Sequence, residues 1–149
     1  GTGDAGYEEA FRSYENGYRR QVCANIMYDE GRAHKIYAGS DVLLVPSKFE
    51  PCGLTQLIAM HYGTVPVVRE TGGLKDTVQP YNMYENDGNG FTFDRYESGL
   101  LYDAINRAKT LYFENREDWD KMVRRNMEKD VSWANSAQQY RWLYLELTQ

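Results

Sequence analysis

The chain has 149 residues, of which 42% are hydrophobic and 26% are charged. These values are typical of a folded globular domain and exclude a chain that is disordered throughout. The 17 Lys and Arg residues are outnumbered by 22 Asp and Glu residues, and this acidic balance argues against a general nucleic-acid-binding protein. No apolar run approaches the ~20 residues of a membrane span, so we expect no membrane-spanning segment.

Cysteine and histidine usage limits the chemistry further. Cys23 and Cys52 lie far apart in the sequence and form no metal-binding or redox pair. His34 and His61 are isolated as well, so we expect no metal and no other cofactor. A reducing, intracellular location fits this pattern best. The loop-like residues 1–4 have nothing before them, so we expect the chain to be part of a longer protein.

The predicted elements alternate between helices and strands over the first two-thirds of the chain. In chain order, apolar spacing predicts a helix over 7–18, a strand over 22–26, a helix over 30–38, a strand over 42–45, a helix over 54–62 and strands over 65–68 and 90–93. The strand at 22–26 is predicted from the alternation of Val22, Ala24 and Ile26. The uninterrupted run at 42–45 is typical of a strand buried on both faces of a parallel sheet. This order favours an α/β fold with a Rossmann-like, doubly wound parallel sheet.

The last part of the chain is predicted to be helical. The expected helices cover residues 98–113, 115–128 and 132–147. In the last of these helices, Trp133, Tyr140 and Tyr144 are expected to pack in the core or against another domain. We treat residues 1–149 as a single domain that ends in these helices, from about residue 98 onward.

The loop over 47–55 joins a predicted strand to a predicted helix and carries most of the candidate chemistry. It holds a carboxylate (Glu50), a thiol (Cys52), a glycine (Gly53) and a hydroxyl (Thr55). Open parallel sheets bind ligands at the carboxyl ends of their strands, where this loop lies. A helix that begins near Gly53 offers unpaired N–H groups and the positive end of its dipole to an anion.

Glu50 would repel a phosphate, so it is better suited to accept hydrogen bonds from neutral hydroxyl groups or to balance a positive charge. Together, the loop residues indicate a ligand with both phosphate and hydroxyl groups, such as a nucleotide-sugar. The alternative is an ordinary strand-to-helix loop with a capping carboxylate. Lys48 and Arg69 lie close to the loops, either near the phosphates or as solvated charges.

A second glycine-bearing loop follows the strand over 65–68. Two adjacent glycines, Gly72 and Gly73, let backbone amides approach a ligand, and a short helical turn is expected to begin at Asp76. This loop should lie at the same edge of the sheet as the first one. The two loops together favour a ligand site more strongly than either loop does alone.

Several segments together resemble the family of bacterial glycogen synthases and plant starch synthases. The segments that agree in type and order are 1–4, 28–30, 37–57, 62–69, 71–78, 88–91 and 132–133. The resemblance covers nearly the whole chain. It implies the C-terminal, donor-binding domain of a glucosyltransferase with two Rossmann-like domains (the GT-B fold), truncated at its N-terminal side. The opposing N-terminal domain, with its acceptor surface, would then lie outside the chain.

The resemblance also implies a reaction and a set of site residues. These enzymes transfer glucose with retention of configuration, from ADP-glucose to the non-reducing end of an α-1,4-glucan. Glu50 would be the catalytic carboxylate beside the donor glucose, where it stabilises positive charge as the glycosidic bond breaks. The implied donor-binding residues are Tyr28, which stacks on the adenine, and Cys52, Gly53, Leu54, Thr55, Gly72 and Gly73.

Three departures from the family pattern bear on function. Ile58 stands where the wider superfamily often has a second glutamate, which disfavours sucrose- or lipid-linked relatives. Met27 stands before Tyr28 where glycine is common, which bears on the shape of the adenine pocket. The basic pair that the family places on the donor phosphates lies outside the chain.

Two alternatives therefore stay open. The first is an isolated nucleotide- or glucan-binding module without catalysis, and the second is a relative that uses UDP-glucose. We expect this chain alone to transfer no glucose. The parent protein is expected in the bacterial cytoplasm or the plastid stroma.

Overall fold

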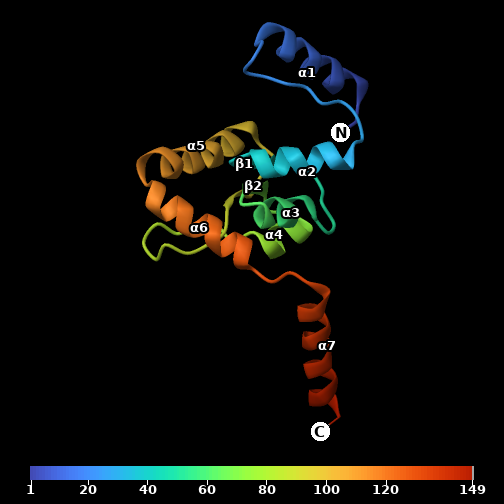
Figure 1. Ribbon diagram of the computed structural model, residues 1–149, viewed down its shortest axis with the longest axis vertical. Coiled ribbons are helices and arrows are strands. Elements are labelled where there is room, and N and C mark those ends of the chain that lie inside the picture. Colours follow the sequence, from blue (N-terminus) through green and yellow to red (C-terminus); the bar gives the residue numbers. More distant parts are fainter. Residues whose placement is uncertain (149) are drawn as a thin grey trace. The chain divides into compact units, whose positions relative to one another are not determined.

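The computed structural model describes residues 1–148, which form two compact units divided after residue 36. Figure 1 labels the helices and the first two strands, β1 and β2. The first unit contains helix α1 (Ala5–Gly17) and most of α2 (Glu30–Gly39). Asp4 caps α1 by accepting a hydrogen bond from the N–H of Gly6 at 2.9 Å. Both helices in this part of the chain are as the sequence predicts, within two residues at most ends.

Residues 22–26 form no strand, so the prediction of a strand there is wrong. Their backbone is irregular, and its polar groups bind partners that are not strands. The N–H of Ala24 donates to the Glu15 carboxylate at 3.0 Å, and the Asn25 carbonyl accepts a hydrogen bond from the backbone nitrogen of Gly1 at 3.1 Å. Alternating apolar residues favour a strand, but a strand also needs a neighbour to pair with.

The second unit is built on a parallel sheet of three strands, in the order β1-β2-β3. The strands are β1 (Val42–Val45), β2 (Val65–Arg69) and β3 (Phe91–Phe93). Val42 pairs with Val65, and Val67 pairs with Phe91. Parallel neighbours need crossover connections, which contain α3 (Thr55–His61) and α4 (Gly72–Thr77). These three strands confirm the prediction of a parallel α/β sheet.

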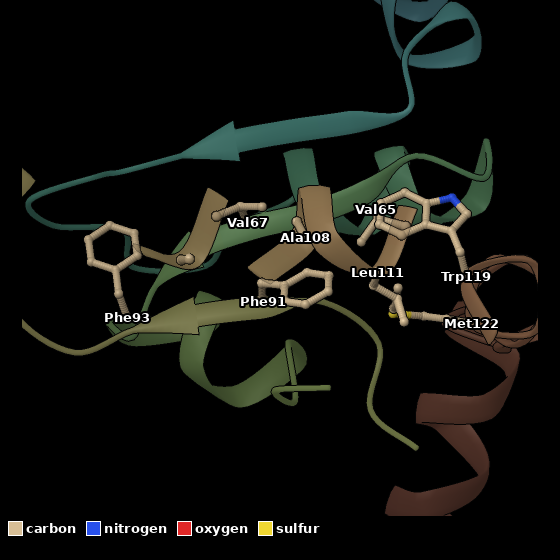
Figure 2. Packing of buried hydrophobic residues seen from close by; sticks show 9 residues of the cluster. Val65, Val67, Phe91, Phe93, Ala108, Leu111, Trp119 and Met122 are labelled. Atoms are coloured by element: carbon tan, nitrogen blue, oxygen red, sulfur yellow. The ribbon is translucent and has the colours of Figure 1, made fainter. Parts of the chain in front are cut away.

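The main core lies between the sheet and the helices α5 (Ser98–Glu114) and α6 (Arg116–Glu128). Figure 2 shows the Trp119 and Met122 side chains of α6 directed toward this cluster. The Trp119 ring stacks on Phe91 with 6.4 Å between ring centroids. The cluster comprises Val65, Val67, Phe91, Phe93, Ala104, Ala108, Leu111, Trp119 and Met122.

A smaller core lies on the opposite face of the sheet. Val68 follows Val67 along β2, so its side chain points to the other face. There it packs with Val45 of β1 and with Leu74 and Val78 in and after α4. Apolar clusters on both faces make the sheet doubly covered, as the sequence predicts. Gly73 and Leu74 are buried, so α4 is fixed against this face.

Helix α7 (Trp133–Leu147) differs from the other helices of the second unit because none of its described residues is buried. The Trp133 side chain is 90% exposed, and Tyr140 and Tyr144 are exposed as well. The expectation that these rings pack in the core is therefore wrong within residues 1–148. Their packing against another domain stays a prediction. No helix in this part of the chain is long and apolar enough to cross a membrane.

Candidate functional site

The loop between β1 and α3 lies at the carboxyl edge of the sheet, where the sequence predicts a ligand site. Ser47 Oγ donates a hydrogen bond to Glu50 Oε2 at 3.3 Å, which fixes one oxygen of a partly buried carboxylate. Cys52 and Thr55 are exposed. Leu54, expected inside the first turn of the helix, precedes α3 and is 66% exposed. The loop therefore exposes Cys52 and Thr55 together with the apolar side chains of Phe49 and Leu54.

The two glycine-bearing loops contact each other through their backbones. The N–H of Gly73 donates to the Pro51 carbonyl at 3.3 Å. A Cβ atom on Gly72 would lie 2.0 Å from the Glu50 carbonyl oxygen, and one on Gly73 would lie 1.6 Å from the Cys52 carbonyl oxygen. Only glycine fits at either position. The pair therefore lets the second loop support the loop that carries Glu50 and Cys52.

The helical turn after the double glycine starts earlier than predicted. Helix α4 begins at Gly72, and Asp76 lies in its last turn instead of at its start. The expectation of a start at Asp76 is therefore wrong, and the two glycines that contact the first loop form the first turn of the helix. Gly72 has φ +46°, a conformation that other residues rarely adopt.

A buried side-chain bridge joins the same two loops. Gln56 in the first turn of α3 donates to the Gly53 carbonyl and to the hydroxyl of Thr77 in α4. The sequence prediction missed both residues. The signal for Gln56 was its spacing, because Gln56, Ala59 and Met60 stand at i, i+3 and i+4 and form the buried stripe of α3.

Arg69 at the end of β2 ties together the ends of all three strands. Its Nε donates to the Ser47 carbonyl at 2.8 Å, and Nη2 donates to the Lys48 carbonyl, both after β1. Its Nη1 donates to the Asp94 carbonyl after β3, at 3.4 Å. The expectation of a solvated charge is therefore wrong, since all three nitrogens have carbonyl partners. Its bonds hold the backbone just before Glu50.

The structure brings most of the predicted site residues to one edge of the second unit. These residues are Glu50, Cys52, Gly53, Leu54, Thr55, Gly72 and Gly73. Tyr28 belongs to the first unit, in the segment before α2, and its side chain is 89% exposed. Its role in the same site stays a prediction. Among residues 1–148, no three His, Cys, Asp or Glu side chains are grouped to hold a metal ion.

The chain matches known glycosyltransferases over most of its length. The family model "Glycosyl transferases group 1" matches residues 2–126. A glycogen synthase of Lachnospira eligens is 52% identical over 147 residues, which are 99% of this chain and 31% of the relative. A glycogen synthase of Clostridium kluyveri is 53% identical with the same coverage. The chain thus spans less than a third of the length of these curated relatives.

Solved structures agree with these relatives. The catalytic domain of starch synthase IV from Arabidopsis thaliana, bound to ADP and acarbose, matches with a TM-score of 0.80 and 39% identity. The match covers 93% of this chain and 29% of that one. A sucrose-phosphate synthase from Thermosynechococcus elongatus matches with a TM-score of 0.67 and 25% identity, over 99% of this chain and 37% of that one.

The family match, the parallel sheet and the loops at its carboxyl edge lead to one assignment. The expected fold, a C-terminal GT-B domain, is confirmed by the starch synthase match. The chain belongs to the glycosyl transferases of group 1 and, within that family, is similar to bacterial glycogen synthases and to plant starch synthase.

Proposed function

We propose that this chain is the donor-binding part of a glucosyltransferase that moves glucose from ADP-glucose to the non-reducing end of an α-1,4-glucan. One observation carries the proposal. Gly72 and Gly73 pack backbone against backbone on the loop that carries Glu50, at the carboxyl edge of a parallel sheet. This edge is where open α/β sheets bind nucleotides and sugars. The resemblance to glycogen and starch synthases over nearly the whole chain supports the choice of reaction.

Glu50 is the catalytic residue of the proposed site. As the bond between glucose and the diphosphate breaks, positive charge develops on the sugar, and a nearby carboxylate stabilises it. Ser47 binds Oε2 of Glu50, so Oε1 remains available for a sugar hydroxyl. We assign Glu50 an electrostatic and hydrogen-bonding role and not that of a nucleophile.

The donor is proposed to bind through backbone groups of the first loop. The N–H groups of Leu54 and Thr55 have no hydrogen-bond partner within residues 1–148. Unpaired N–H donors suit the oxygens of a diphosphate, and Cys52 and Gly53 complete the same stretch of backbone. Gly72 and Gly73 contribute by holding this loop in place. Tyr28 is proposed to stack on the adenine.

The nucleotide and the remaining partners are proposals as well. The starch synthase IV structure contains ADP, and this supports ADP-glucose over UDP-glucose. Ile58, in place of a second glutamate, agrees with that choice. We propose that no metal takes part, that an N-terminal domain of the same protein supplies the glucan-binding surface, and that a basic pair outside this chain supplies the cations for the leaving diphosphate. The proposed location is intracellular.

The replacement Glu50→Ala in the full-length protein tests the proposal. We expect the rate of glucose transfer from ADP-glucose to fall by about 100-fold or more, with ADP affinity near that of the wild type. Transfer is measured as radiolabelled glucan and ADP affinity by calorimetry. Glu97→Ala is the matched control, because Glu97 is an exposed carboxylate near the end of β3 that pairs with the exposed Arg95.

Two outcomes would contradict the assignment. A large loss of ADP affinity in Glu50→Ala would place Glu50 in nucleotide binding instead of catalysis. If the wild type transferred glucose from UDP-glucose but not from ADP-glucose, the proposed donor would be wrong. The reaction would still be a glucosyl transfer.

A further inference from the structure

We propose that Gln56 is a positioning residue that, through Thr77, fixes the direction of the Leu54 N–H in the donor-binding loop. This inference rests on the proposed function, because it assigns a role to a residue behind the proposed donor site. Gln56 is 0% exposed, so its side chain acts on a ligand only through the groups that it holds. Sequence reasoning gave Gln56 no role.

The bridge is a directed chain of three hydrogen bonds. Gln56 Nε2 donates to the Gly53 carbonyl at 2.5 Å and to Thr77 Oγ1 at 2.9 Å. Thr77 Oγ1 in turn donates to the Gly73 carbonyl at 2.6 Å. One side-chain amide and one hydroxyl thus connect both glycine-bearing loops from behind.

Each group in this series of hydrogen bonds has one possible orientation. A hydroxyl has a single hydrogen, and Thr77 uses it on the Gly73 carbonyl, so it must accept from Gln56. The Gly53 carbonyl is an acceptor too, so the amide group of Gln56 must direct its NH₂ toward both. The other amide atom, Oε1, is buried and has no partner within residues 1–148. A buried acceptor without a hydrogen bond lowers the free energy of unfolding. The opposite orientation of the amide would be worse, because it would direct Oε1 toward the Gly53 carbonyl oxygen.

The bond to Gly53 determines where the next N–H points. In a trans peptide the C=O and the following N–H point in opposite directions. Because Gln56 holds the Gly53 carbonyl toward the buried side, the N–H of Leu54 points away from it. Gly53 itself has φ +69°, and a Cβ atom there would lie 2.8 Å from Gln56 Nε2. The position of the buried Gln56 amide therefore requires glycine at position 53, both for its positive φ and for the space that a Cβ atom would occupy.

Loss of the bridge would free this peptide to rotate. The Leu54 N–H would then no longer be held toward a bound donor, and donor affinity would fall. The acceptor glucan is proposed to bind to another domain, so its KM should not change. A residue that only stabilised the fold would not separate the two substrates in this way.

The test uses the full-length protein and two nearly isosteric changes at one position. Thr77→Val removes the hydroxyl and keeps the shape, whereas Thr77→Ser keeps the hydroxyl. In Thr77→Val and in Gln56→Met, we expect the KM for ADP-glucose and the Kd for ADP to rise about tenfold, the equivalent of one hydrogen bond. Thr77→Ser should stay within about twofold of the wild type. Gln79→Met is the control, because Gln79 is exposed and its side chain is not part of the bridge.

Kinetics are measured well below the unfolding temperature of each variant, and KM is determined separately for donor and glucan. Equal increases in both KM values, or wild-type donor affinity in Thr77→Val, would overturn the inference. The amide chemical shift of Leu54 in the unliganded protein, measured by NMR, gives a second readout that needs no substrate, because it reports the orientation and environment of the peptide between Gly53 and Leu54. We expect a shifted Leu54 amide signal in Thr77→Val and a signal near that of the wild type in Thr77→Ser. If the wild type does not transfer glucose from ADP-glucose, the proposed function fails, while an unchanged Leu54 amide signal in Thr77→Val would refute the bridge itself.

Discussion

At the scale of single residues, the two adjacent glycines have a structural role in addition to the one that their sequence suggests. Gly72 and Gly73 were predicted to bring backbone amides close to a ligand. In the structure they bring one loop close to the other, and the carbonyls of Glu50 and Cys52 occupy the space that side chains would need. A direct contact with the donor stays a prediction. Glycine is required at both positions for a steric reason, because backbone atoms of the protein itself leave no room for a side chain.

Gly73→Ala should therefore destabilise the protein strongly. A Cβ atom 1.6 Å from the Cys52 carbonyl oxygen cannot be accommodated without moving a backbone segment, so we expect a loss of about 3 kcal/mol or more in the free energy of unfolding. Urea denaturation of the full-length protein measures the loss. Gly99→Ala is the matched control, because nothing lies within 4 Å of its added Cβ in α5, and it should change stability by less than about 1 kcal/mol. Equal stability of the two variants would contradict the backbone contact.

The sequence predicted only those parts of the site whose residues lie close together along the chain. The residues from Glu50 to Thr55 follow a buried strand directly, so their place at the sheet edge followed from the strand prediction. Gln56 and its partner Thr77 are 21 positions apart, and Arg69 and Ser47 are 22 apart. A single sequence does not show which distant carbonyl or hydroxyl a polar side chain will meet, so these supports emerged only from the fold.

At the scale of elements, one guanidinium group links the three strand ends. Arg69 belongs to β2 and donates to carbonyls that follow β1 and β3. A planar group with five N–H donors can bind several carbonyls at once, which a lysine cannot do with the same geometry. The edge that carries the candidate site is thus cross-linked by side-chain bonds in addition to the strand pairing.

Arg69→Met should lower the free energy of unfolding by about 1 to 3 kcal/mol, because three backbone carbonyls lose a charged donor. The Arg95→Met control should cost less than about 0.5 kcal/mol, since Arg95 is 64% exposed and pairs with exposed carboxylates. Both values come from chemical denaturation of the full-length variants. A stability loss no larger than that of Arg95→Met would show that the cross-link contributes nothing.

Element prediction succeeded where burial decides the pattern. The runs at 42–45 and 65–68 were both confirmed as strands. The residues of β2 are buried almost throughout, whereas the expectation that 42–45 is buried on both faces is wrong, because only Val45 is buried and Leu44 is 46% exposed. The segment at 22–26 failed because its alternation describes a strand without saying what pairs with it. In α7, the aromatic rings were predicted to pack in the core or against another domain, and they are exposed within residues 1–148, so only the second alternative stays a prediction. Hydrophobic side chains indicate that a face needs a partner, but they do not identify it.

At the scale of the whole molecule, the chain spans 31% of the glycogen synthases that it resembles. The loop residues and the tyrosine proposed to bind the donor come from this chain, whereas the basic pair proposed for the donor phosphates and the proposed acceptor surface do not. The described residues form two compact units. Whether residues 1–149 form a single domain is not decided by this division, so the single domain stays a prediction. Half of a two-domain cleft can bind a ligand without assembling the transition state.

The isolated chain should therefore transfer no glucose from ADP-glucose to maltoheptaose. The missing part would supply the cations for the departing diphosphate and the surface that orients the acceptor. Sensitive detection of labelled glucan checks this, with the full-length protein as the positive control. Turnover by the isolated chain would contradict the expectation. Calorimetry of the chain with ADP, UDP and maltoheptaose adds a second criterion, since glucan binding without ADP binding would favour a glucan-binding module.

The backbone contact between the two loops also has a consequence for protein engineering. Around the proposed donor site, positions divide into those that are free to vary and those that are not. Cys52, Leu54 and Thr55 present exposed side chains, so libraries aimed at new donor sugars or nucleotides can be built there at little cost in stability. Gly73 and Gln56 support the loop from behind, and a library that includes them would mostly sample unfolded or misaligned proteins.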